Sequence, residues 1–140
     1  MRMAIIAGVA LVAAGCAGTG QVIETTGRSM SATMTGTGGY DGRAAVAVNT
    51  TGNSTAATIS LAGDQSGVTR PWHIHTGACG SGGGVVGAAA AYPPLSVGSN
   101  GRANAEARVN VGLQAGQSYH VNIHESASNL GNVIACANLR

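Results

Sequence analysis

The chain has no phenylalanine, no lysine and few charged residues of either sign. Charged side chains make up 9% of its 140 residues, and the formal net charge is +2. The seven arginines are scattered along the sequence. Because nucleic acid binding needs a basic stripe or patch, this distribution predicts no nucleic acid partner. Without phenylalanine, a hydrophobic core must be built mainly from valine, isoleucine, leucine and alanine.

A sustained helical repeat of apolar residues is also missing. With 23 glycines and many threonines, serines and asparagines, the composition instead suits short strands joined by turns. The clearest strand covers residues 103–111, where alanine and valine alternate with asparagine, glutamate and arginine. Such period-two alternation is typical of a sheet with one buried face. The sequence therefore predicts an all-β fold, an antiparallel sandwich or barrel.

Further strands are expected in the first half of the chain. Residues 22–35 are rich in threonine, serine and methionine and form one long strand or two short ones. Residues 43–50 and 55–62 flank Thr51-Gly52-Asn53-Ser54, a composition typical of a hairpin turn. Residues 37–42 are glycine-rich and are expected to form a turn as well.

The N-terminal segment has the pattern of an export signal. An apolar run, residues 3–14, follows the single basic residue Arg2 and is too short for a comfortable membrane span. It ends in Ala13-Ala14-Gly15-Cys16, which resembles the lipobox of bacterial lipoproteins, although leucine is the commoner residue at the position of Ala13. The alternative is an ordinary signal peptide with an incidental cysteine.

This pattern predicts the organisation of the whole chain. We expect residues 1–15 to be a signal peptide, residues 16–21 a lipidated N-terminus with a short tether, and residues 22–140 the β domain. Lipidation of Cys16 would anchor the domain to a membrane of the cell envelope without a spanning helix. Ala17 carries no aspartate-type retention signal, which favours the outer membrane or the cell surface.

Two cysteines remain beyond Cys16. An even pair in an exported chain predicts one disulfide, Cys79–Cys136. It would close a loop of about 60 residues and stabilise the fold by roughly 3–4 kcal/mol in the chain-entropy model.

All four histidines fall in two strand-like segments, residues 71–79 and 118–125. His73 and His75 share one face of the first strand, and His120 and His124 share one face of the second. In each segment the alternate positions are apolar and must face the core, so the histidines are expected on the outer face. Neutral imidazole is a good ligand for copper, zinc and nickel, and a His-x-His pair offers two nitrogens to one ion. The alternative is that each histidine is a solvated surface residue.

The residues around these histidines resemble a known family. Residues 73–79, His-Ile-His-Thr-Gly-Ala-Cys, are similar to the His-Val-His segment and the following Gly and Cys of the Cu,Zn superoxide dismutases. Residues 121–126 and 129–131 resemble that family's Val-Val-His-Glu and Asp-Leu-Gly signature, and residues 133–137 resemble its Leu-Ala-Cys-Gly strand. The matches lie in the C-terminal half, and the chain looks most like small secreted bacterial members of the family.

The resemblance implies a Greek-key β-sandwich or barrel of about eight antiparallel strands with copper on its outer surface. It implies that His73, His75 and His124 are three copper ligands. It also implies the same disulfide, in which Cys79 and Cys136 pin the loop after the His-x-His strand to the last strand.

Several parts of the family pattern are missing from this chain. Residues 80–94 contain no histidine and no acid, so the bridging histidine and the zinc ligands are absent and zinc is not expected. The arginine that guides superoxide is replaced by Asn132 and Val133. The long electrostatic loop has shrunk to residues 126–132. These departures favour copper binding over efficient dismutation.

Two polar residues of the second histidine segment are expected close to the ligands. His120 lies four residues before His124, roughly 13–14 Å away along a straight strand, so it lines the edge of the site or is a solvated strand histidine. Asn122 is better placed to hydrogen-bond a ligand. No catalytic residue is assigned. Three hypotheses remain: an envelope lipoprotein that binds copper, a copper-only superoxide dismutase, and a metal-free structural module.

Overall fold

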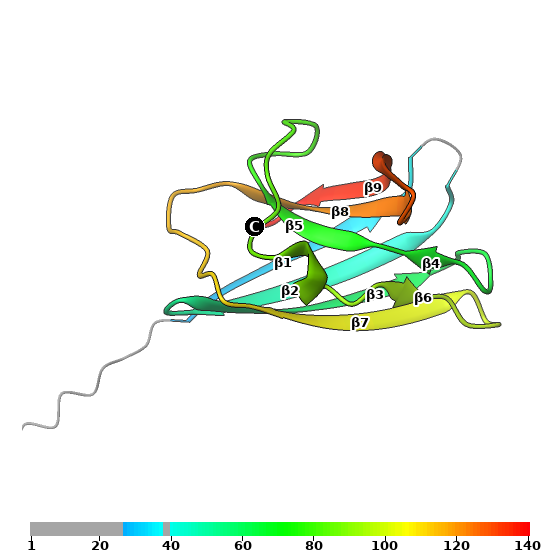
Figure 1. The fold of residues 1–140 in the computed structure, drawn as a ribbon, viewed down its shortest axis with the longest axis horizontal. Coiled ribbons are helices and arrows are strands. Elements are labelled where there is room, and N and C mark those ends of the chain that lie inside the picture. The colour runs from blue at the N-terminus through cyan, green and yellow to red at the C-terminus, as the bar shows by residue number, and fades with distance from the viewer. Residues whose placement is uncertain (1–26, 38–39) are drawn as a thin grey trace, which may run out of the picture.

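The computed structural model describes residues 27–37 and 40–140 (Figure 1). The predicted signal peptide, Cys16 and the tether lie outside these residues. The described strands are β1 (Arg28–Thr35), β2 (Arg43–Thr51), β3 (Ser54–Ala62), β4 (Thr69–Arg70), β5 (Trp72–Thr76), β6 (Leu95–Ser96), β7 (Arg102–Val109), β8 (Tyr119–Ser126) and β9 (Asn129–Asn138), with one 3₁₀ turn, η1 (Ala89–Ala91). Within the described part of the chain, no helix is long and apolar enough to cross a membrane.

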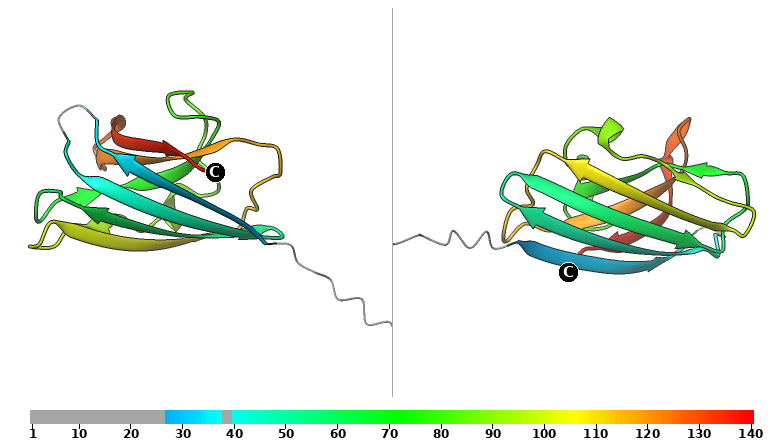
Figure 2. Two further views of the ribbon diagram at one scale, coloured as in Figure 1. Left: turned by 180° about the vertical axis from the view of Figure 1, so that it is seen from behind. Right: turned by 90° about the horizontal axis from the view of Figure 1, so that it is seen from below.

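The strands form three antiparallel sheets in a sandwich (Figures 1 and 2). One layer is the four-stranded sheet β1-β2-β3-β7, and the other is the three-stranded sheet β5-β8-β9. The short ribbon β4-β6 contacts β8 of one layer and β7 of the other. The predicted all-β sandwich is therefore confirmed. The sheets do not close into a barrel.

The two layers meet along one edge, where β1 lies beside β9 (Figure 2, left). The backbone of Ser31 exchanges two hydrogen bonds with that of Arg140, at 2.9 and 3.2 Å. Farther along, the Thr37 amide donates to the Ile134 carbonyl at 2.8 Å. These bonds fix the end of the chain, and with it β9, against the four-stranded sheet.

The four-stranded sheet follows the alternation expected from its sequence. In β2, exposed and buried residues alternate at every position. The predicted hairpin between β2 and β3 is present, and Gly52 in its turn has a positive φ of 58°, which favours glycine. The inner face of this sheet consists almost entirely of aliphatic side chains and methionines. It includes Met30, Val48, Ile59 and Leu61.

The predicted strand over residues 103–111 extends too far at its C-terminal end. β7 ends at Val109, and the side chain of Val111 is 41% exposed. The chain leaves the sheet here to pass over the β2–β3 turn, where the Thr55 hydroxyl donates to the Val111 carbonyl at 2.7 Å. A Cβ on Gly112 would lie 2.1 Å from the Gly52 carbonyl oxygen. The alternation is therefore broken by a close backbone contact that the sequence does not reveal.

The core is closed on the other side by the apolar face of β5 and β8. Trp72, Ile74, Val121 and Ile123 are fully buried there. The Trp72 indole donates its N–H to the Pro93 carbonyl at 2.8 Å, so its one polar atom is satisfied. The predicted inner faces of both histidine segments are confirmed.

Candidate metal centre

The histidines lie on two neighbouring strands. β5 and β8 pair antiparallel, with His75 opposite His120 and His73 opposite Asn122. Because Trp72 and Ile74 turn into the core, His73 and His75 occupy the opposite face of β5. This is the sheet face predicted from the sequence.

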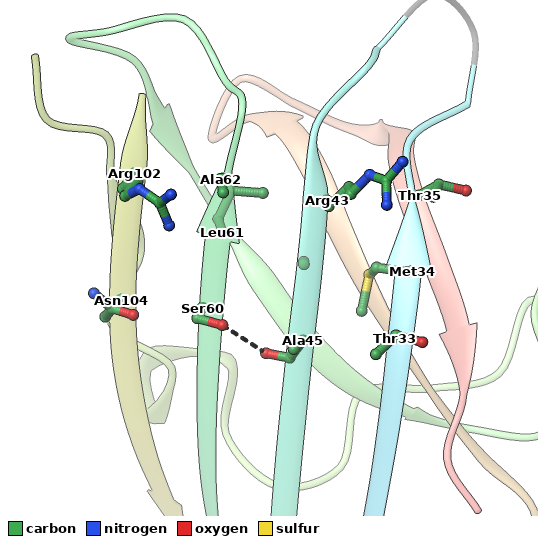
Figure 3. Close-up of a pocket in the computed structure, with 11 residues that line it drawn as sticks. Thr33, Met34, Thr35, Arg43, Ala45, Ser60, Leu61, Ala62, Arg102 and Asn104 are labelled. Carbon is green, nitrogen blue, oxygen red and sulfur yellow. Dashed lines mark hydrogen bonds between the residues drawn. The ribbon is translucent and has the colours of Figure 1, made fainter. Parts of the chain in front are cut away.

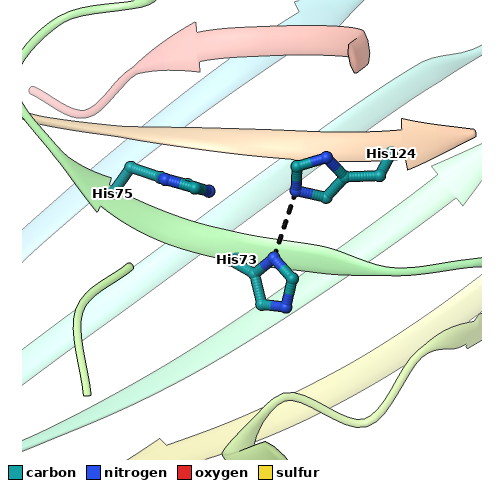
Figure 4. A group of neighbouring side chains, drawn as sticks. All are labelled: His73, His75 and His124. Carbon is teal, nitrogen blue, oxygen red and sulfur yellow. Dashed lines mark hydrogen bonds between the residues drawn. The ribbon is translucent and has the colours of Figure 1, made fainter. Parts of the chain in front are cut away.

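His73, His75 and His124 come together on this face (Figure 4). Each offers one ring nitrogen, and the three nitrogens lie within 4.8 Å of one another. The His124 ring centroid is 5.1 Å from that of His73 and 5.9 Å from that of His75. One metal ion can therefore be reached by all three rings. Among the described residues, these three histidines form the group with metal-ligand spacing.

Backbone carbonyls determine which ring nitrogen of His75 and of His124 is free to bind a metal ion. His75 Nδ1 donates to the Gly83 carbonyl at 2.9 Å, and His124 Nδ1 donates to the Leu130 carbonyl at 2.7 Å. In the neutral rings, Nε2 of both histidines therefore carries the lone pair. His75 Nε2 is shut away from solvent and has no hydrogen-bond partner. A buried nitrogen with an unused lone pair suits a metal ligand.

The third nitrogen belongs to His73. Its Nδ1 lies 3.1 Å from Nε2 of His124. Without a metal, the His73 Nδ1–H donates to that lone pair. If the His73 proton moves to Nε2, Nδ1 becomes a ligand beside the other two nitrogens. The donor set is then Nδ1 of His73 with Nε2 of His75 and of His124.

The outer face of this sheet is covered, so the alternative of solvated surface histidines is wrong for three of the four. His73 is 7% exposed, His124 4% and His120 1%, whereas His75 keeps partial exposure of its side chain. The Tyr92 ring packs edge-on against His73, at 5.4 Å between centroids. Strand alternation indicates only which face of a strand a residue occupies, and loops distant in sequence decide whether that face is covered.

Burial keeps the candidate ligands neutral. Desolvation, followed by the neighbouring His124 and His75, lowers the pKa of His73 from 6.5 to about 4. Desolvation also lowers the pKa of His75 and of His124, although their hydrogen bonds to carbonyls act in the opposite direction. The neutral imidazole is the form that binds metal ions.

A glycine-rich loop, residues 77–84, forms part of the cover over the histidines. Its close approach to β5 depends on glycine. The Thr76 amide donates to the Gly84 carbonyl at 3.0 Å, so the loop runs beside the edge of β5. A Cβ on Gly83 would lie 1.7 Å from the Thr76 carbonyl oxygen. Gly77, at the start of the loop, has a positive φ of 83°. The glycine content of residues 80–84 indicates a loop, but nothing in the local sequence reveals that this segment holds His75.

The predicted disulfide is confirmed and fixes this loop. Cys79 and Cys136 are bonded, with 6.0 Å between their Cα atoms. The Cys79 amide also donates to the Asn138 side-chain oxygen at 2.8 Å. The loop after β5 is thereby tied to β9.

A β-bulge on β9 lies opposite His124. Ile123 pairs with Ala135, but His124 pairs with Val133, so Ile134 is an extra residue on β9. A bulge bends its strand and redirects nearby side chains. No local sequence signal marks this position.

His120 and Asn122 lie beside the three histidines. Both line a pocket of about 510 Å³ together with His75 and His124. The His120 ring stacks on that of His75 and is not part of the three-histidine group. Asn122 Oδ1 is buried without a hydrogen-bond partner, and no hydrogen bond joins Asn122 to His73, His75 or His124.

A second hollow, of about 550 Å³, lies over the four-stranded sheet (Figure 3). Its floor is made of small side chains such as Ala45 and Ser60, with Arg43 and Arg102 among its lining residues. No histidine, cysteine, aspartate or glutamate lines it. The chemistry for binding a metal is therefore concentrated on the three-stranded sheet.

Comparison with known proteins does not identify a family for this chain. No family model, curated protein or solved structure matches the chain. Membership of the superoxide dismutase family stays a prediction from the sequence motifs.

Proposed function

We propose that this protein is an exported lipoprotein that binds one copper ion through His73, His75 and His124. The observation that carries the proposal is the convergence of three ring nitrogens in a largely buried position, with two of the rings oriented by backbone carbonyls. Ligands held in advance on two paired strands lose little entropy when the ion binds.

The donor set favours copper. Among first-row divalent ions, nitrogen ligands bind Cu²⁺ most tightly. A structural zinc site almost always has four protein ligands, so three histidines without a thiolate or carboxylate do not form one, although three histidines and a water also hold catalytic zinc. When bound, copper would supply one-electron redox chemistry. The residues themselves supply three neutral nitrogens and a partly closed environment.

The charges around the site support binding more than rapid turnover of an anion. Arg70, the arginine nearest to the His-x-His strand in sequence, donates to Asp64 at 2.8 Å and to the Glu125 carbonyl at 2.7 Å. Its charge is therefore paired rather than free to attract an anion. The guiding arginine of the dismutase pattern is replaced by Asn132 and Val133. Little remains to raise the rate of encounter with superoxide.

The envelope location rests on the sequence of residues 1–16, which carries the export and lipidation patterns. The Cys79–Cys136 bond supports it, because disulfides persist in oxidising compartments outside the cytosol. Labelling with a radioactive fatty acid tests the lipid anchor: wild-type protein should be labelled, and a Cys16→Ser variant should not.

Copper titration of the purified protein tests the binding site. We expect one ion per chain, and a loss of affinity of at least 100-fold when His73, His75 or His124 is replaced by alanine. Arg108→Ala, on the four-stranded sheet, is the control and should leave the affinity unchanged. Retention of full affinity by the histidine variants would disprove the site.

The same purified proteins distinguish copper binding from the two other hypotheses, a copper-only dismutase and a metal-free structural module. A superoxide assay on the copper-loaded protein should show little activity, and rapid turnover would favour the copper-only dismutase. Failure of the wild-type protein to bind copper would favour the metal-free structural module.

A further inference from the structure

His120 is the histidine that the metal-ligand group leaves out. It is 1% exposed and is among the largest fully buried side chains. Burying a polar ring costs free energy unless its polar atoms find partners. Its Nδ1 donates to the Gly77 carbonyl at 3.0 Å, so one nitrogen is satisfied and the ring orientation is fixed.

The face of the His120 ring lies against His75. The two residues are directly opposite each other on β8 and β5. Their ring centroids are 5.1 Å apart, and the ring planes differ by 20°. His75 is therefore held at two places: its Nδ1 by the Gly83 carbonyl at 2.9 Å and its face by the His120 ring.

This arrangement argues against His120 as a fourth ligand. The lone pair of an imidazole nitrogen points outward in the plane of its ring. In two stacked rings the planes are nearly parallel, so the lone pairs of the two rings do not converge on one point. The His120 ring would therefore not hold the same ion as Nε2 of His75.

We propose that His120 is a positioning residue, which sets the ring plane of His75 and so aims its Nε2 at the metal. This inference rests on the proposed copper site. Both carbonyls that hold the pair, those of Gly77 and Gly83, belong to the loop that the disulfide ties to β9. The loop, the His120 ring and the His75 ring form one continuous support.

Histidine combines two properties at this position: a flat face for stacking and an Nδ1–H donor for Gly77. Two substitutions separate them. His120→Phe keeps a flat ring and loses the donor, and His120→Asn keeps a donor near the Nδ1 position and loses the ring face. If His120→Asn does not fold, His120→Leu replaces it, because leucine fills the volume without a flat ring.

The experiment compares these variants loaded with one equivalent of Cu(II). Loss of an outer partner of a ligand lowers metal affinity by roughly 10- to 100-fold. We therefore expect His120→Asn to lose about 10-fold in affinity and to shift the visible absorption band and the copper hyperfine coupling. His120→Phe should stay within about 3-fold of the wild type, with little spectral change.

A matched control lies on the opposite face of the same strand. Val121 is fully buried in the core, away from the histidines. Val121→Ala should lower the unfolding temperature of the metal-free protein and leave copper affinity and spectrum unchanged. If His120 had only a structural role, His120→Asn would likewise lower the unfolding temperature and leave copper affinity and spectrum unchanged.

The outcomes distinguish this inference from the proposed function. If the wild type binds no copper, or if His73→Ala has no effect, the proposed function fails. If copper binding requires His73 but His120→Asn leaves affinity and spectrum unchanged, only the positioning role fails. Loss of a nitrogen coupling from the electron paramagnetic resonance spectrum of His120→Phe would show instead that His120 is a ligand.

Discussion

The two main sheets of this sandwich use strand alternation differently. In the four-stranded sheet, β2 buries every second residue and exposes the others. In the three-stranded sheet, five of the eight residues of β8 are buried and they come from both faces, so both faces are covered. The inner face is apolar, and the outer face carries His120 and His124. Covering a polar face costs desolvation free energy, which the four-stranded sheet avoids.

This difference indicates that the two sheets have different roles. The four-stranded sheet contributes aliphatic packing, with Val48 and Ile59 at 1% and 2% exposure, and presents small polar and charged side chains to solvent. The three-stranded sheet completes the core with Trp72 and Ile74 and holds the histidines on its other face. Perturbing the first sheet should affect stability alone, whereas perturbing the cover of the second should affect the site.

The largest expected effect is a cavity in the four-stranded sheet. Ile59→Ala should lower the free energy of unfolding by about 2–5 kcal/mol, because a fully buried side chain is truncated. The copper affinity of the folded protein should not change. Urea denaturation and copper titration measure the two quantities. A clear loss of affinity at an unchanged stability would remove the distinction between the sheets.

Removal of the disulfide should affect both properties. In the chain-entropy model, replacing Cys79 and Cys136 by serine costs roughly 3–4 kcal/mol of stability. It also releases the loop whose Gly83 carbonyl orients His75, so copper affinity should fall. Denaturation and titration of the double variant check this. An unchanged affinity in the folded variant would show that the loop holds its place without the bond.

The metal-free protein should lose stability as the pH falls from about 7 toward 4. An unfolded histidine gains its proton near pH 6.5, whereas the pKa of His73 in the folded chain is about 4. Between these values the unfolded state binds more protons, so acid favours unfolding. The pKa of Asp64 is shifted below 3.8, because the bonds from Arg70 and the Gln65 amide outweigh the opposing effect of burial. Its contribution is therefore lost only at lower pH.

Unfolding curves at pH 7.5, 6.0 and 4.5 measure this dependence, with His73→Phe as the comparison. The variant should depend less steeply on pH than the wild type. Equal slopes for the two proteins would contradict the assignment of the effect to His73.

The last comparison concerns two neighbouring glycines of the loop, and it is made on copper affinity. Gly83→Ala places a methyl group 1.7 Å from the Thr76 carbonyl oxygen, which must push the loop away from His75. Copper affinity should fall by roughly 10-fold, as for loss of an outer partner of a ligand. At Gly84 a Cβ would meet nothing within 4 Å, so Gly84→Ala is the matched control. Equal affinities for the two variants would show that loop contact does not orient His75.

The sequence alone predicted what depends on local periodicity. Alternation placed Trp72 and Ile74 inside with His73 and His75 on the other face, and turn composition predicted the β2–β3 hairpin. The cysteine count gave the correct disulfide. Each of these follows from rules that act over a few residues or over a small set of cysteines.

The parts that could not be predicted depend on distant segments. The bulge at Ile134, the cover by Tyr92 and the stacking of His120 on His75 each join segments well separated in sequence. His120 illustrates the limit most clearly: its spacing from His124 predicts a place at the edge of the site, where it does line the pocket, but only the pairing between strands reveals that it stacks on His75. Local patterns fix a side chain's face, and tertiary packing fixes its neighbours.

The most direct test of the account is the number of histidine nitrogens on the metal. Pulsed electron paramagnetic resonance of the protein with one equivalent of Cu(II) should show couplings from three imidazoles. Each of His73→Ala, His75→Ala and His124→Ala should remove one of them, and Arg108→Ala should remove none. A copper spectrum that none of the three histidine substitutions changes would contradict the account.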